Sequence, residues 1–433
     1  MLGETLAFLD NGYAFIEKRR AWHGPVFRTR ILGRETAVIA GPDACRVWID
    51  PTKIQRAGSM PPNVQTIFGG RSLPLLDDAE HRARKTQVLA GFAPELLPRY
   101  VDELAPIVRA SLARWVAAGE IAFVAAAKRL AKEGICRNVL GLEPGPVTAS
   151  LIADYSFVTA GVTALPVPLP GTAYSRALKA RDRIFATYDR LIAEHHAAEK
   201  GGRAGADGLA HMLAAPGPDG LRISDAAARL EIHHVVVAGY IIFAELVAAL
   251  LHLTQDAASL ARLRAEVDGT IGAKTPTAAL LVQLPCLDQV VQETKRLCPI
   301  LPAIFGKART TFEFAGHTIP EGWMVLWAIR STQLDPGVYT APERFDPQRF
   351  APDRAEHLRH EHGFSPHGPG TYQGHKCPGT DYATLFMSLV LAELVGRHDW
   401  ELPPQNADYN WKKTPPEPRD GLRLRLRTRP GSA

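Results

Sequence analysis

The chain has 433 residues, 46% of them hydrophobic, and a formal net charge of +5 from 50 basic and 45 acidic side chains. This length is ample for a large buried core. The mild charge, without a dense run of lysine and arginine, gives no support to nucleic-acid binding. Five scattered cysteines form no CxxC pair and no even framework, a pattern typical of reduced thiols in a cytosolic protein.

The N-terminal segment combines apolar side chains with three carboxylates. Residues 3–19 are expected to form one amphipathic helix. Its carboxylates distinguish the segment from a signal peptide and from a membrane anchor. Residues 26–32 and 35–40 alternate around Gly33-Arg34, which predicts a β-hairpin.

The middle of the chain is predicted to be mostly helical. Residues 78–160 have a helical pattern that proline and glycine interrupt. The proline-rich residues 163–172 predict an ordered loop, and residues 174–199 a long helix. Glycine-rich loops are expected at 201–208 and 214–220.

A second long helix is expected from Ser224-Asp225 to about Leu253. Residues 235–244 are apolar nearly all round, which is typical of a helix buried in the middle of a large protein. Glu245 and two histidines argue against a membrane span.

The C-terminal third predicts strands and irregular chain. Residues 304–328 alternate like short strands, residues 335–363 form a proline-rich meander, and residues 422–428 form a half-buried strand. No repeat or linker is visible. The expected fold class is mainly α with small β-sheets (α+β).

Residues 364–379 form a glycine- and proline-rich loop that ends in Cys377, and an apolar pattern of helical period follows. A thiol at a helix N-terminus faces unpaired N–H groups and the positive end of the dipole, and both favour thiolate. Thiolate is an axial ligand of haem iron, and glycines let the backbone lie against a flat ring. For a lone cysteine, a buried structural thiol is the alternative.

The order of residues in this loop resembles the haem-binding loop of the cytochrome P-450 superfamily. The residues that fill the superfamily positions are Phe364, Gly368, His375, Cys377 and Gly379. The spacing from Phe364 to Cys377 is longer than usual, and the long form is similar to the loop of the bacterial fatty-acid peroxygenase branch. The resemblance implies haem b with Cys377 as the axial ligand and with Phe364, Gly370, His375 and Gly379 at the cofactor.

The resemblance gives meaning to a motif that is weak alone. Glu293 and Arg296 share one helix face at i, i+3, and a solvated surface pair is the plain alternative. Because a strand-rich stretch, Arg349 and the Cys loop follow in the superfamily's order, the resemblance implies that Glu293, Arg296 and Arg349 form its buried structural triad.

Basic residues at two further places match haem-propionate contacts of the superfamily. His81 and Lys85 have the superfamily spacing at the start of a predicted helix, although a solvated helix turn is the alternative. His375 is a third candidate. The usual arginine position after Pro302 falls on Gly306, so Lys307 or Arg309 would substitute.

The centre of the second long helix departs from the superfamily pattern. Oxygen-activating members carry Ala-Gly-x-acid-Thr, whose acid and alcohol relay protons. Here Ala238 and Gly239 are present, but Ile241 and Ile242 replace acid and alcohol, and isoleucine can relay nothing. The Arg-Pro of the peroxygenase branch is missing as well.

Other polar residues of this helix are candidates for the missing acid–base group. Helical spacing puts His234, Ala238, Ile241 or Ile242, and Glu245 along one stripe. His234 or Glu245 could act as the acid–base group. A satisfied helix histidine and a glutamate paired with a distant base are the alternatives.

Length alone favours about two or three domains, but the resemblance implies one cytochrome P-450 domain over residues 1–433. Its β-containing part would span about 1–60, its helical body about 61–300, and its strands, meander, Cys loop and last helix about 301–433. The haem would lie between the long central helix and the Cys loop with its following helix.

We therefore expect a haem-thiolate monooxygenase or peroxygenase, soluble, bacterial-type and cytoplasmic, acting on a small hydrophobic substrate. Three mechanisms remain open: oxygenation with electrons from a ferredoxin- or flavodoxin-type donor, use of hydrogen peroxide, and non-oxidative dehydration or isomerisation. A haem sensor or carrier without turnover is the alternative of another class. We expect no nucleic-acid partner and no membrane anchor.

Overall fold

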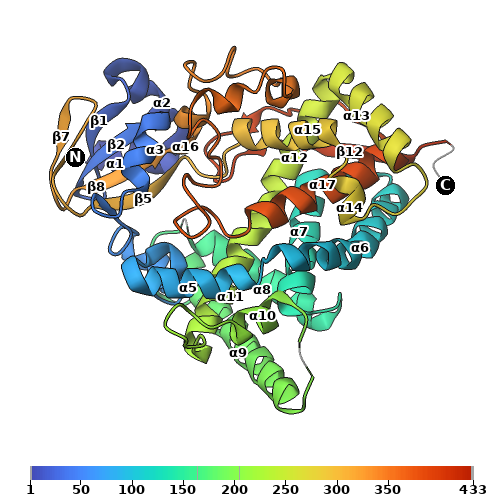
Figure 1. Ribbon diagram of the computed structural model, residues 1–433, viewed down its shortest axis with the longest axis horizontal. Helices are drawn as coiled ribbons and strands as arrows, with labels where there is room; N and C mark the ends of the chain where they lie inside the picture. The colour runs from blue at the N-terminus through green and yellow to red at the C-terminus, as the bar shows by residue number, and fades with distance from the viewer. Residues whose placement is uncertain (1, 163, 204, 431–433) are drawn as a thin grey trace. The chain divides into compact units, whose positions relative to one another are not determined.

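The computed structural model describes residues 2–162, 164–203 and 205–430. Contacts divide the chain into two compact units (Figure 1). The first unit comprises Met1–Gln55, Val108–Ala127 and Ile241–Ala433, and the second comprises Arg56–Ile107 and Lys128–Tyr240. The expectation of a single domain stays a prediction.

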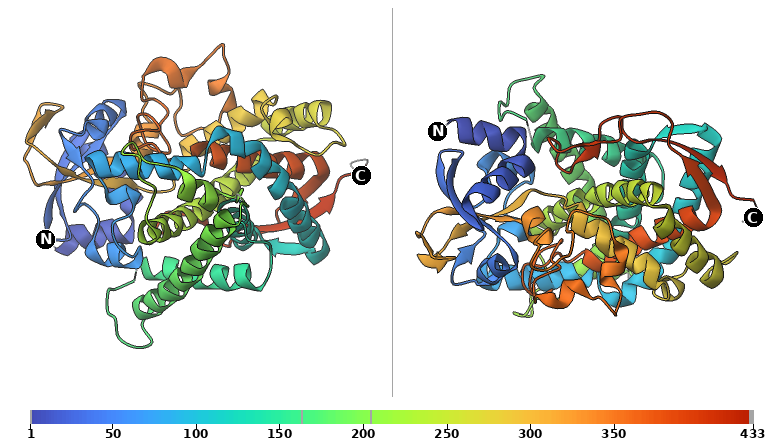
Figure 2. Two further views of the ribbon diagram at one scale, coloured as in Figure 1. Left: turned by 60° about the horizontal axis from the view of Figure 1, so that its bottom comes forward. Right: turned by 90° about the horizontal axis from the view of Figure 1, so that it is seen from above.

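A mixed five-stranded sheet lies in the first unit, in the order β1-β2-β8-β5-β3. Its strands are β1 (Val26–Ile31), β2 (Arg34–Ala40), β8 (Met324–Ala328), β5 (Ala303–Ala308) and β3 (Ile54–Gln55). β1 and β2 form the predicted antiparallel hairpin, and β2 pairs in parallel with β8. The two segments that supply these strands are far apart in sequence but lie side by side in Figure 2, as blue and orange strands.

The expected single helix at residues 3–19 is wrong, because the chain forms two helices there. α1 (Leu2–Asp10) and α2 (Gly12–His23) are separated at Asn11. The backbone of Asn11 has φ −156°, which is not helical, and its side chain accepts the Ala14 N–H at 2.9 Å. Asparagine favours this N-cap geometry, so a helical apolar pattern concealed a new helix start.

Apolar side chains hold α1, α2 and α3 (Pro42–Ile49) against the sheet. Phe8 and Phe15 pack with Phe305 in one cluster. Trp48 and Trp327 pack in a second cluster, with ring centroids 6.1 Å apart. Both clusters combine residues from two segments that are far apart in the sequence, 8–54 and 303–329.

The remaining elements of the first unit are its large helices and several short turns and strands. These elements are α12 (Phe243–Gln255), α13 (Ala257–Thr270), α14 (Ala278–Leu281), α15 (Pro285–Leu297), α16 (Ile329–Gln333), α17 (Thr380–Arg397), the 3-10 turns η4 (Pro347–Phe350) and η5 (Glu356–Arg359), and the short strand pairs β6 (Phe312–Phe314) with β7 (His317–Ile319) and β10 (Tyr409–Asn410) with β11 (Glu417–Pro418). α12, α13 and α15 each contact α17. The predicted meander at 335–363 contains only η4 and η5.

The predicted C-terminal strand is confirmed. β12 (Arg423–Thr428) lies between β4 (Glu120–Ala122) and β9 (His398–Glu401) in a three-stranded sheet. Leu424 and Leu426 are buried, and Arg425 between them is exposed, as the alternating sequence requires.

The second unit is helical. Its elements are α4 (Pro62–Ile67), η1 (Leu73–Leu75), α5 (Asp78–Ala90), η2 (Pro94–Leu96), α8 (Pro146–Val162), α9 (Ala173–Lys200), α10 (Gly208–Ala214) and α11 (Asp225–Gly239); α6 (Leu97–Ala118) and α7 (Phe123–Leu140) continue into the first unit. α9 confirms the predicted helix at 174–199. Residues 164–172 form the predicted non-helical segment, while Thr163 and Ala204 lie outside the described residues.

The long helix that begins at Ser224 is interrupted at its centre. The Ser224 hydroxyl caps α11, and the turn η3 (Tyr240–Ile242) precedes α12. By length and composition the run Asp225–Gln255 could cross a membrane, with a mean hydropathy of 2.2, but 78% of its apolar window is buried inside the protein. A core helix of a globular protein passes the same test.

We expect Gly161→Ala to lower the free energy of unfolding by about 1–3 kcal/mol. Gly161 lies where α8 packs on α9, and a Cβ there would overlap the Cβ of Ala177. Urea unfolding measures the change. The matched control is Gly269→Ala in α13, where no atom lies within 4 Å of the added Cβ, so stability should hold or rise. Equal stability of the two variants would contradict this packing.

Candidate functional site

Cys377 lies directly before α17, whose N-cap is Gly379. The Cys377 N–H donates to the carbonyl of His367 at 2.9 Å, and Thr380 Oγ1 donates to the carbonyl of Cys377 at 2.9 Å. The residue is half-exposed. The unpaired N–H groups and dipole of the helix favour a thiolate at this place.

The other four cysteines are poorer ligands. Burial raises the pKa of Cys45, Cys136 and Cys298 to about 12, and burial together with Glu266 raises the pKa of Cys286. Within the described residues, no group of three or more His, Cys, Asp or Glu side chains is placed to hold a metal ion. Among the five cysteines, Cys377 is the best candidate for a ligand of haem iron.

A glycine turn and an aromatic contact shape the Cys loop. Gly368 has φ +96°, and a Cβ there would lie 3.1 Å from the His375 carbonyl oxygen, so a side chain would strain the turn. Phe364 anchors the start of the loop by packing edge-on against Phe350, at a centroid distance of 5.2 Å. Residues 374–380 are half-exposed throughout. A loop with this exposure and these glycines would accept a planar group such as haem, and Cys377 would hold its iron.

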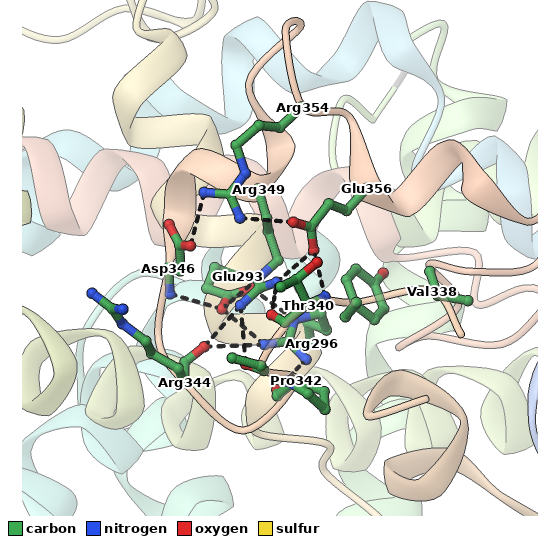
Figure 3. Close-up of polar contacts among 12 residues, drawn as sticks. Glu293, Arg296, Val338, Thr340, Pro342, Arg344, Asp346, Arg349, Arg354 and Glu356 are labelled. Atoms are coloured by element: carbon green, nitrogen blue, oxygen red, sulfur yellow. Dashed lines mark hydrogen bonds and ion pairs between the residues drawn. The ribbon is translucent and has the colours of Figure 1, made fainter. Parts of the chain in front are cut away.

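The Glu293 carboxylate lies at the centre of a buried network (Figure 3). Arg296 donates to both of its oxygens, at 2.7 and 2.8 Å, and Arg349 donates from Nε at 3.0 Å. All three side chains are fully buried. The sequence motif thus brings its three residues together, from α15 and η4.

The two guanidinium groups also fix the meander. Arg296 donates to the carbonyls of Gln333 and Pro342, and Arg349 donates to those of Thr340 and Arg344. Irregular chain has few ladder bonds of its own, so these donors supply them. The network therefore determines the path of the chain that precedes the Cys loop.

Two members of the network were missed by the sequence analysis. Glu356 accepts from Arg349 at 2.7 Å and from Arg354 at 2.7 Å. Burial alone would raise the pKa of Glu356, but the hydrogen bond from Arg354 and the further contacts lower it to about 2. The signal was weak because the meander has no periodicity that would orient a side chain.

A buried basic cluster lies at the start of α5 in the second unit. His81, Lys85 and Arg56 are 5%, 2% and 3% exposed, and Asp77 accepts the backbone N–H of Arg56 at 2.8 Å. Burial lowers the pKa of His81 to about 4 and that of Arg56 to about 9, although Asp77 opposes both shifts. Bases outnumber acids here, so an anionic group such as a carboxylate of haem would be well matched.

Arg56 was missed because it belongs to no motif, and only its burial distinguishes it.

The residues expected to replace the usual arginine lie in β5 or directly after it. A Cβ at Gly306 would approach the Trp48 ring to 2.9 Å, so packing occupies the usual arginine position. Lys307 pairs with Gln55 in the sheet. Arg309 follows the end of β5, where its N–H donates to Lys53 at 2.7 Å, and its role at the cofactor stays a prediction.

The centre of the long helix is accessible although its flanks are buried. Ala238 is exposed and Ile241 half-exposed, while residues 235–237 and Ile242 are buried. The 3-10 turn η3 advances about 120° per residue instead of about 100°, so three residues rotate the face by roughly 60°. The predicted single stripe is therefore interrupted between Ala238 and Glu245.

His234 lies beside a fixed carboxylate. Its Nδ1 is 3.5 Å from Glu231 Oε2. Glu231 is fully buried, and its Oε1 accepts the Leu73 N–H at 2.9 Å and Arg84 at 2.8 Å. The His234 side chain is 15% exposed. This arrangement orients one ring nitrogen toward the carboxylate and the other away from it.

Glu245 has a different partner, from the Cys loop. Its Oε1 accepts His367 Nε2 at 2.6 Å, and Glu245 is 1% exposed. Burial alone would raise the pKa of Glu245, but His367 and then Lys295 outweigh burial and lower it. The sequence analysis did not single out His367, because the superfamily pattern assigns a position to His375 and none to His367.

This combination of a helical fold and a helix-terminal thiol defines a class, the haem-thiolate enzymes. A family model described as Cytochrome P450 matches residues 148–421, so the chain belongs to the cytochrome P450 family. The family uses haem with a cysteine thiolate as axial ligand, and its members are oxidising enzymes.

Three similar proteins illustrate the relationship. Putative cytochrome P450 120 of Synechocystis is 30% identical over 428 residues, which cover 98% of this chain and 94% of the relative. A solved structure of cyanobacterial CYP120A1 with retinoic acid bound is 29% identical, covers 98% of this chain and 96% of that chain, and has a TM-score of 0.89. Cytochrome P450EX alpha with myristic acid is 21% identical, covers 98% and 97%, and has a TM-score of 0.81, which shows the shared fold alone.

Arg349→Met should lower the free energy of unfolding by about 3–5 kcal/mol, because it leaves two buried carboxylates with fewer donors. Haem content should fall with it. Arg354→Met, whose side chain is 33% exposed, is the control and should cost less than about 1 kcal/mol. Urea unfolding and haem absorbance measure both. Equal losses in the two variants would contradict the central place of Arg349.

Lys85→Met should weaken the binding of haem to the protein. With haem bound, transfer of haem to an apo-globin acceptor should be about 10-fold faster, since a charge-assisted bond is lost. The exposed Arg82 on the same helix supplies the control Arg82→Met. Slower or unchanged haem loss would remove Lys85 from the cofactor site.

Proposed function

We propose that this chain is a haem-thiolate monooxygenase that oxidises a small, largely apolar molecule. The single observation that carries the proposal is the accessible, apolar centre of the long helix, at Ala238 and Ile241, in a chain whose Cys377 is presented at the start of α17. Apolar side chains also remain exposed in the proline-rich segment, with Leu165 at 82% and Leu169 at 63%. Such surfaces favour an apolar substrate.

Haem, when bound, supplies the oxygen chemistry. Cys377 Sγ would hold the iron, and the glycine-rich loop would support the ring. His81 and Lys85 would neutralise its carboxylates, as the family pattern suggests. His375 and Arg309 remain candidates for the same task.

The chain's own acid–base group is proposed to be His234. Ile241 and Ile242 can neither donate nor accept a proton, and Glu245 is occupied by His367. Glu231 would stabilise the His234 imidazolium through Nδ1, so the other nitrogen, Nε2, can release and recover a proton. Arg84 and the Leu73 N–H hold Glu231 still while this happens.

Retinoic acid is the first substrate to test, because a solved relative contains it. It combines an apolar chain with one carboxylate. A ferredoxin- or flavodoxin-type protein is the proposed electron donor, as redox proteins serve the family in general.

Peroxide-driven oxidation is the second candidate. The observation that favours it is the pair of isoleucines, because hydrogen peroxide brings its own protons and electrons. Non-oxidative rearrangement at the iron would fit the same observation. A haem carrier would show no spectral change with any apolar compound.

The test compares oxidants on the purified, haem-loaded protein. We expect NADPH with surrogate redox proteins to yield oxidised product, and His234→Ala to lower product per NADPH by about 10-fold or more. Ile241→Glu with Ile242→Thr should restore coupling in that background. His196→Ala, on the exposed surface of α9, is the control. Tight coupling that survives His234→Ala would contradict the proton role, and faster turnover with peroxide than with NADPH would favour the second candidate.

A further inference from the structure

One ion pair joins the central helix to the Cys loop inside the first unit. Glu245 of α12 and His367 of the loop meet through Oε1 and Nε2 at 2.6 Å. The Glu245 side chain is 1% exposed and that of His367 10% exposed. A charge-assisted bond in such a dry place is short, strong and directional.

The same histidine also touches the metal ligand through its backbone. The His367 carbonyl accepts the Cys377 N–H at 2.9 Å. The next residue, Gly368, has φ +96° and donates its N–H to Ser365 at 3.1 Å, so the chain turns sharply after His367. A shift of the His367 backbone would therefore move the carbonyl that holds the cysteine backbone, and the bond of the imidazole to Glu245 restrains that backbone.

The two side chains make no other hydrogen bond within the described residues. Glu245 Oε2 and His367 Nδ1 are buried and lack hydrogen-bond partners there. Lys295 is the nearby buried cation, but its Nζ donates to Thr384 Oγ1 at 2.6 Å, on α17. The loop thus depends on one bond to α12 at this point.

We propose that Glu245 and His367 are positioning residues of the haem ligand: the bond between them fixes the His367 carbonyl, which fixes the Cys377 backbone and the direction of its thiolate. Glu245 then acts on the cofactor through His367 and not as a proton donor to substrate. This inference rests on Cys377 as the iron ligand and is independent of the oxidant and the substrate.

The experiment separates positioning from stability. Glu245→Leu leaves His367 buried without its acceptor, so both stability and ligand geometry should suffer. Glu245→Leu combined with His367→Leu removes both polar groups and should restore folding and haem content. It should not restore the bond that positions the loop. Glu245→Gln keeps an acceptor for His367 and should retain most of the wild-type behaviour.

The readout is the red-shifted Soret band that thiolate ligation gives to the reduced carbonyl complex. In the double variant, the carbonyl complex should lose this band and gain the band of haem without thiolate ligation. This conversion should be at least about 10-fold faster than in wild type or Glu245→Gln, a factor that corresponds to the loss of a bond worth about 1.4 kcal/mol. Glu361→Gln, on the exposed meander, is the control.

A double variant with a wild-type conversion rate would overturn the proposal, because the pair would then serve stability alone. A failed Glu245→Gln rescue beside a normal double variant would overturn it too. Absence of the band in wild-type protein would instead overturn Cys377 ligation itself, and Cys377→Ser supplies that reference spectrum.

Discussion

The structure of the first unit depends on the buried carboxylate of Glu293 between two arginines. An unpaired carboxylate there would be very unfavourable, and well-placed guanidinium groups convert that penalty into specificity. Each arginine has donors left over, and the backbone carbonyls of the meander take them. These hydrogen bonds hold the irregular chain before the Cys loop in one conformation. A thiolate ligand at the end of that chain requires such support.

The central helix obeys a second constraint, because it must be buried and yet give access at its middle. The 3-10 turn at Tyr240–Ile242 meets both needs by rotating the helix face. His234 lies before the turn, beside Glu231 and half-exposed. Glu245 lies after it, buried against the Cys loop. Two polar residues that seemed equivalent in the sequence therefore have different partners and different proposed tasks.

The sequence predicted much of the fold, since hairpin, long helices and C-terminal strand follow from local periodicity. It also predicted that Glu293, Arg296 and Arg349 meet in one buried triad, because a family pattern relates them. It failed where a single side-chain contact or the burial of one residue decides. The break at Asn11 depends on one side-chain cap, Arg56 is distinguished only by burial, and the Glu245–His367 bond joins residues 122 positions apart. No periodicity encodes such a pairing.

These observations bear on how the site could work without the acid and alcohol of the superfamily pattern. Ile241 and Ile242 keep the accessible centre of the helix apolar. The residues proposed for polar roles, His234 and Glu245, lie on either side of this centre. Glu231 is anchored by Arg84 and a backbone N–H, so His234 has a fixed counter-charge within its own unit. Glu245 is likewise committed to His367. Glu231 and Glu245 are thus each matched by partners within the same unit, and the apolar centre would suit the apolar part of the proposed substrate.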